Sequence, residues 1–151
     1  MISLVATDLD GTLLNSDSKV SRENREAIER ASRAGIVTIA ATARSARSVA
    51  SIGREAGLGS IAICANGSVG YNIETDELLW HHRLPGTDTI ELLAELRRRA
   101  PGFLFAAEQH KEFFSEPHFL RNEVVITGFT HVDQIETVLG EGATKIICRH
   151  P

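Results

Sequence analysis

Three short, continuous apolar runs near the start of the chain constrain its fold more than any other feature. They are ISLVAT (2–7), IVTIAA (36–41) and IAICA (61–65). An unbroken apolar run of this length is typical of a β-strand in a parallel sheet, where helices cover both faces. We therefore expect three strands that are buried on both faces.

The segments between these runs have the pattern of amphipathic helices. A serine precedes each helix as a candidate cap and a glycine follows it as a stop signal: Ser21 and Gly35, then Ser45 and Gly57. The order is therefore βαβαβ, which predicts an α/β fold with a parallel sheet and right-handed crossovers. Sites in such sheets lie beyond the carboxyl ends of the strands, here at residues 8–12, 42–45 and 66–68.

The rest of the chain has a mixed α+β pattern. Apolar segments on either side of Thr75 and Asp76 predict a hairpin, and residues 85–102 predict a helix. Strand patterns follow at 103–108, 112–116, 123–129 and 144–149, with a short helix expected at 132–139. We therefore expect a first domain at 1–84 and a second at 85–151.

The helix expected at 85–102 has two further sequence signals. Asp88 and Glu91 have the spacing of a capping box. Three leucines at helical spacing are expected to face inward: Leu92, Leu93 and Leu96.

Composition limits the class of protein. The chain has 151 residues, with 42% hydrophobic residues, 24% charged residues and a net charge of -4, so we expect no general attraction to nucleic acid or to acidic lipid. The start MISLVATDLD lacks a basic segment, and no apolar run reaches membrane-spanning length. These features predict a cytoplasmic protein. Cys64 and Cys148 lie in apolar runs and are expected to be buried.

Two aspartates follow the first apolar run in the segment VATDLDGTLL (5–14). The side chains of Asp8 and Asp10 point to the same side of a strand, where two carboxylates repel each other. Mg²⁺ can hold both in the ionised form, because it binds few protein oxygens together with substrate phosphate. Asp8 can then attack phosphorus, and Asp10 can act as general acid and then as base. Gly11 allows a sharp turn, and Thr12 supplies a hydroxyl and an amide.

These residues resemble a known family. DLDGT after a buried first strand resembles motif I of the haloacid dehalogenase superfamily, most of whose members are Mg²⁺-dependent phosphatases. IAATAR (39–44) resembles its motif II, and ICANGS (63–68) followed by a hairpin and an α/β insertion resembles the Cof-type branch. The resemblance covers the whole chain. It implies a Rossmann-like parallel sheet core and an inserted α+β cap domain, both incomplete here.

The resemblance also implies a role for each matching residue. Asp8 resembles the nucleophile and a Mg²⁺ ligand, and Asp10 resembles the acid/base, with its backbone carbonyl on the metal. The positions expected to bind phosphate are Thr12, Thr42, Ala43, Arg44 and Asn66. The implied reaction is hydrolysis of small phosphorylated metabolites, such as sugar phosphates, through an aspartyl-phosphate.

The chain departs from the family pattern in three ways. Ala43 stands where the family usually has glycine, so its Cβ could crowd the phosphate or prevent a positive φ. None of the lysines, Lys19, Lys111 and Lys145, matches the lysine of motif III, and no second acidic pair resembles motif IV. We therefore expect a truncated chain, roughly the N-terminal half of such an enzyme, with little or no activity alone.

Plainer interpretations remain open for several residues. Thr42 can cap the next helix, Asn66 and Gly67 form a turn signal, and Arg44 can be a surface helix residue. His81 and His82 would point to opposite faces of a strand, so no metal is assigned to them. The arginines at 97–99 are expected to form a solvated helix end that is favourable for the helix dipole.

Two functions from other classes also fit the sequence. A phospho-accepting signalling module uses a similar acidic cluster, but its acceptor aspartate follows a later, inner strand. A non-catalytic fragment would bind a partner, or a second copy of itself, through an exposed edge of the sheet. We expect a small phosphorylated metabolite as ligand, no nucleic acid or membrane partner, and self-association through that edge.

Overall fold

The computed structural model describes residues 2–109, 112–120 and 129–150. The chain forms two compact units, Met1–His81 and His82–Pro151. The domains expected at 1–84 and 85–151 divide the chain slightly later, and their roles as core and cap stay predictions.

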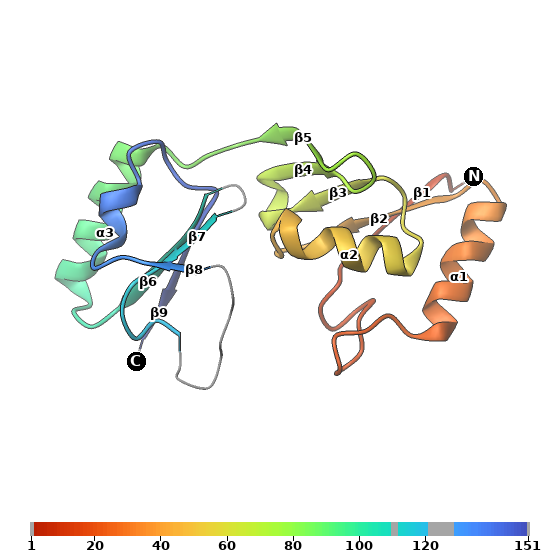
Figure 1. Ribbon diagram of the computed structural model, residues 1–151, viewed down its shortest axis with the longest axis horizontal. Helices are drawn as coiled ribbons and strands as arrows, with labels where there is room; N and C mark the ends of the chain where they lie inside the picture. Colours follow the sequence, from red (N-terminus) through yellow and green to blue (C-terminus); the bar gives the residue numbers. More distant parts are fainter. Residues whose placement is uncertain (1, 110–111, 121–128, 151) are drawn as a thin grey trace. The chain divides into compact units, whose positions relative to one another are not determined.

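The first unit is built on a five-stranded sheet in the order β1-β2-β3-β4-β5 (Figure 1). Its strands are β1 (Leu4–Thr7), β2 (Val37–Ala41), β3 (Ile61–Cys64), β4 (Val69–Asn72) and β5 (Glu77–His81). The first three are parallel, whereas β4 and β5 add to β3 as an antiparallel hairpin. The parallel strands and their crossover helices confirm the predicted α/β fold.

The two crossover helices are α1 (Arg22–Arg33) and α2 (Ala46–Ala56). The Ser21 side chain accepts a hydrogen bond of 3.1 Å from the backbone N of Asn24, as a capping serine should. Ser45 occupies the corresponding position before α2 but makes no capping hydrogen bond through its side chain. Gly57 ends α2 with a φ of 72°, in the left-handed region that favours glycine.

Among the described residues of the first unit, α1 and α2 pack against one face of the sheet, and the other face is partly exposed. Ala40, Ala62 and Tyr71 lie in the core formed with α1 and α2. Side chains alternate along a strand, so the neighbouring residues face the other way. There Leu4, Val37 and Ile61 are 53%, 48% and 42% exposed, so the expectation of strands buried on both faces is wrong. The apolar runs identified the strands, but the helices that cover a face come from elsewhere in the chain.

The second unit contains a four-stranded sheet in the order β8-β7-β6-β9. Its elements are α3 (Gly86–Arg99), β6 (Leu104–Gln109), β7 (Glu112–Ser115), β8 (Phe129–His131), a 3-10 turn η2 (Ile135–Val138) and β9 (Lys145–Arg149). Its core contains Leu93 of α3, Phe105 and Ala107 of β6, and Ile135 and Leu139. The strand expected at 123–129 falls mostly outside the described residues.

The structure contradicts part of what the sequence predicts for the start and the buried face of α3. The helix begins one turn before the expected cap, because Pro85 is the N-cap and Asp88 already lies in the first turn. The expected capping box with Glu91 is therefore not at the helix start. Leu93 is buried as expected, but Leu92 is 56% exposed and Leu96 is 36% exposed.

Two further observations concern burial and membranes. Cys64 is buried as expected, whereas Cys148 is exposed, because β9 is the end strand of its sheet. Within the described ranges, no helix is both long and apolar enough to cross a membrane.

Candidate functional site

A cavity of about 460 Å³ lies at the carboxyl ends of β1, β2 and β3. Its lining residues are Asp8, Ala41, Thr42, Ala43, Ile63, Asn66 and Gly67. The structure thus brings together four residues of the predicted site: Asp8, Thr42, Ala43 and Asn66. This is the position at which open parallel sheets place their ligands.

The loop after β1 holds Asp8 at the end of its strand. The backbone N of Leu13 donates to the carbonyl O of Asp8 at 3.3 Å. The backbone N of Leu14 donates to the carbonyl O of Leu9 at 2.8 Å. Leu9 and Leu13 are buried and anchor the loop. Gly11 makes the turn with a φ of 75°, which other residues adopt only with strain. The Asp8 side chain remains exposed at the cavity.

Backbone hydrogen bonds join the loops after β2 and β3. Thr42 N donates to Ile63 O at 2.9 Å, and Asn66 N donates to Thr42 O at 3.1 Å. Ala65 N donates to Arg44 O at 2.8 Å. Asn66 has a φ of 58°, a left-handed conformation that asparagine tolerates better than most residues. The turn signal at Asn66 is therefore correct, and the same turn places this residue at the cavity.

Thr42 and Ala43 line the cavity from the segment that connects β2 to α2. The hydroxyl oxygen of Thr42 accepts a hydrogen bond of 3.2 Å from Arg44 N, so it supports this local turn, whereas Ser45 occupies the N-cap position of α2. Ala43 is not among the residues with positive φ. The Cβ that replaces the family's usual hydrogen therefore causes no backbone strain here.

Asp10 and Arg44 form an ion pair with two hydrogen bonds. Arg44 Nε donates to Asp10 Oδ2 at 2.7 Å, and Nη2 donates to Oδ1 at 2.6 Å. These hydrogen bonds hold the pKa of Asp10 below its ordinary value and raise the pKa of Arg44. The side chains are 57% and 27% exposed. The interpretation of Arg44 as a surface helix residue is wrong, because it precedes α2 and binds the second aspartate of the pair.

Thr12 is also predicted to bind phosphate, but the structure places it outside the cavity lining. Its side chain is exposed and is not among those lining the cavity. Its backbone N donates to Leu9 O at 3.3 Å, inside the loop itself.

The oxygen atoms near the cavity limit which metal it could hold. Among the described residues, no group of three or more His, Cys, Asp or Glu side chains is arranged to hold a metal ion. The Asp10 carboxylate is engaged by Arg44, which leaves the Asp8 carboxylate and the side-chain oxygen of Asn66 at the cavity. These hard donors fit Mg²⁺, provided that water and a phosphate supply most of its ligands.

The chain resembles several solved structures. A haloacid dehalogenase-like hydrolase from B. subtilis is 25% identical with a TM-score of 0.74, and the match covers 91% of this chain and 56% of that chain. TM0651 from Thermotoga maritima is 20% identical with a TM-score of 0.73, covering 97% and 55%. BT1666 from Bacteroides thetaiotaomicron, described among phosphatases of the haloalkanoate (HAD) superfamily, is 24% identical with a TM-score of 0.72, covering 95% and 53%. This chain therefore spans about half the length of these structures.

Comparison at the level of sequence gives the family directly. No curated protein sequence matches the chain. The family profile described as haloacid dehalogenase-like hydrolase matches residues 5–146, which is most of the sequence. The chain therefore belongs to the family of haloacid dehalogenase-like hydrolases.

Proposed function

We propose that this chain carries the nucleophile-bearing part of a Mg²⁺-dependent phosphatase of the Cof type, acting on small phosphorylated metabolites such as sugar phosphates. One observation carries the proposal: Asp8, Thr42, Ala43 and Asn66, predicted from their motifs, line one cavity at the carboxyl ends of the parallel strands. Membership of a hydrolase family supports the reaction class.

The proposed reaction has two steps. The Asp8 carboxylate attacks phosphorus, the bond to the substrate alcohol breaks, and Asp10 gives that alcohol its proton. Asp10 then takes a proton from water, which attacks the aspartyl-phosphate and releases phosphate, so that Asp8 is restored. In this proposal the Thr42 hydroxyl and the Asn66 side chain orient the phosphoryl oxygens. Mg²⁺, when bound, would neutralise charge on those oxygens.

We expect this chain by itself to hydrolyse phosphate esters slowly. Lys19 is the one lysine in the sequence of the first unit, and it lies outside the cavity lining. Among the described residues that line the cavity, Asp8 is the one acidic side chain, so Mg²⁺ would find few protein ligands there. Both shortages leave the charge of a phosphate beside Asp8 poorly neutralised.

An assay with an aryl phosphate and Mg²⁺ tests the proposal. We expect little or no turnover, and any that occurs should be lost in Asp8→Asn and kept in Asp17→Asn, which changes an exposed aspartate in the loop before α1. Turnover that survives Asp8→Asn contradicts the role of Asp8. Rapid turnover by the unchanged chain contradicts the expected weakness of the isolated site.

A second, non-catalytic function is supported by the exposed apolar side chains of the sheet in the first unit. Among the described strands, β1 stands at the end of its sheet and pairs with β2 alone. Its sequence LVAT lacks the charged residues and prolines that usually protect edge strands from pairing. We propose that two copies of the chain associate through β1 and the neighbouring apolar side chains, among them Leu4 and Val37.

A further inference from the structure

The Asp10–Arg44 ion pair joins a side chain from the loop after β1 to one from the loop after β2. The backbone of Arg44 is fixed, because its N donates to Thr42 Oγ1 and its O accepts from Ala65 N. Arg44 therefore starts directly beside Ala43 at the cavity and can change only the direction of its side chain. In the described structure that side chain is directed to Asp10.

The charge of the cavity lining matters for what the Arg44 side chain binds. Its seven lining residues include the carboxylate of Asp8 and no lysine or arginine. A phosphate bound beside Asp8 would therefore meet a negative group, while the guanidinium of Arg44, the residue after Ala43, is occupied by Asp10. A guanidinium binds carboxylate and phosphate through the same planar pair of N–H groups. The two anions thus compete for one donor.

We propose that Arg44 exchanges partners: it binds the Asp10 carboxylate when the site is empty, and the phosphoryl oxygens when phosphate is present. This inference rests on the proposed function of the cavity. It adds that Asp10 lowers the affinity for phosphate by competing for Arg44, and that phosphate releases Asp10 toward the leaving group. Arg44 is then a positioning residue for Asp10 as well as a ligand of the anion.

The exposure of the Asp10–Arg44 pair sets how strongly Asp10 competes with phosphate for Arg44. Ion pairs with exposed partners contribute little, so the release of Arg44 should change phosphate affinity only about two- to fivefold. Asp10→Asn should therefore tighten the binding of inorganic phosphate by about that factor. In an Arg44→Gln background the same substitution should have no such effect, because nothing remains to be released.

The test is an NMR titration of the chain with inorganic phosphate in the presence of Mg²⁺. The variants are the unchanged chain, Asp10→Asn, Arg44→Gln and the double variant, and Arg22→Gln is the control for loss of one positive charge at an exposed arginine. Backbone spectra show that each variant is folded. The Arg44 Nε–H signal should move as phosphate binds, together with the amide signals of Thr42 and Asn66.

Two results would overturn the exchange. One is an equal gain in phosphate affinity from Asp10→Asn in the presence and in the absence of Arg44, which would indicate simple repulsion between Asp10 and phosphate. The other is phosphate that moves the amides of Thr42 and Asn66 but leaves Arg44 Nε–H unchanged; this result leaves the proposed function intact. If phosphate moves no signal around the cavity in any variant, the proposed function fails, and the exchange fails with it.

Discussion

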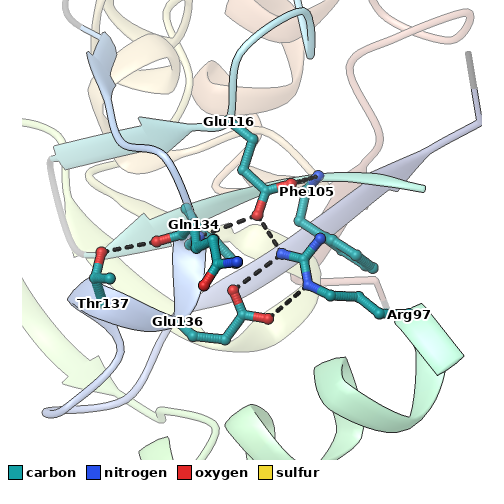
Figure 2. Close-up of polar contacts among 7 residues, drawn as sticks. Arg97, Phe105, Glu116, Gln134, Glu136 and Thr137 are labelled. Atoms are coloured by element: carbon teal, nitrogen blue, oxygen red, sulfur yellow. Dashed lines mark hydrogen bonds and ion pairs between the residues drawn. The ribbon is translucent and has the colours of Figure 1, made fainter. Parts of the chain in front are cut away.

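Arg97 donates two hydrogen bonds to Glu136, from Nε to Oε1 at 2.7 Å and from Nη2 to Oε2 at 2.9 Å (Figure 2). It also binds the buried carboxylate of Glu116, which accepts from the backbone N of Phe105 at 2.9 Å and of Ile135 at 3.0 Å. The guanidinium lies 4.7 Å from the centre of the Phe105 ring. This network joins α3 to β6 and to η2.

Arg97 therefore differs from its neighbours in the helix. The solvated helix end expected at 97–99 is correct for Arg98 and Arg99, which are exposed and pair with Glu95. It is wrong for Arg97, because the helix turns this side chain toward two carboxylates of the second unit.

Replacement of Arg97 should destabilise the second unit. In Arg97→Met the buried Glu116 keeps its two backbone donors but loses its cation, so we expect a loss on the order of 3 kcal/mol in the free energy of unfolding. Arg98→Met is the matched control, because Arg98 is exposed and its replacement should change the free energy of unfolding far less than Arg97→Met does. Urea unfolding of both variants measures the difference. Equal losses would contradict the structural role of the network.

The same network predicts how stability depends on pH. Hydrogen bonds from Arg97 hold the pKa of Glu136 below its ordinary value in the folded protein. A lowered pKa stabilises the fold above the ordinary glutamate pKa of about 4.3, and this stabilisation is lost as the pH falls below it. The free energy of unfolding should therefore fall less steeply below about pH 5 in Glu136→Gln than in the unchanged chain. Parallel slopes would show that Glu136 makes no such contribution.

Gly70 leaves room for the ring of Trp80 on the neighbouring strand. A Cβ at position 70 would lie 2.1 Å from a ring carbon, and the Trp80 Nε1 is held by a hydrogen bond of 3.1 Å to Gly67 O. Gly70→Ala should therefore cost about 1–3 kcal/mol of stability. Thermal or urea unfolding should show a much smaller cost in a Trp80→Ala background. Gly140→Ala, which meets no atom within 4 Å, is the neutral control.

Self-association through β1 predicts a response to charge at the sheet edge. Sedimentation of the unchanged chain should show a species larger than the monomer. Leu4→Lys places a charge at a side chain that is 53% exposed, and should weaken association by about tenfold or more. Leu92→Lys changes an equally exposed leucine of α3 and should have no effect. A monomer at all concentrations rules out this interface.

Local sequence signals predicted most of the fold and four of the seven residues that line the cavity. Ser21 caps α1 and Gly57 ends α2 as expected, because these effects act over a few residues. The strand ends then place Asp8 beside Thr42 by the geometry of parallel sheets alone. The pairs Asp10–Arg44 and Arg97–Glu136 could not be predicted, because their members are 34 and 39 residues apart and no spacing rule links them.

The uncovered sheet face shows a second limit of sequence patterns. A run such as ISLVAT indicates a strand, but its burial depends on which elements pack against it. Leu4 and Ala40 have equally apolar sequence surroundings, yet one is 53% exposed and the other is fully buried. The place of each residue in the fold makes this distinction: Ala40 lies in the core formed with α1 and α2, whereas Leu4 lies on the end strand β1.

The most direct test concerns Asp8 as the acceptor of a phosphoryl group. Fluoroberyllate mimics a phosphoryl group on a carboxylate, and fluorine NMR detects it without any need for turnover. With Mg²⁺ present, the chain should show signals of bound fluoroberyllate that vanish in Asp8→Asn and persist in Asp17→Asn. Bound signals that persist in Asp8→Asn, or their absence from the unchanged chain, would contradict the proposed role of Asp8.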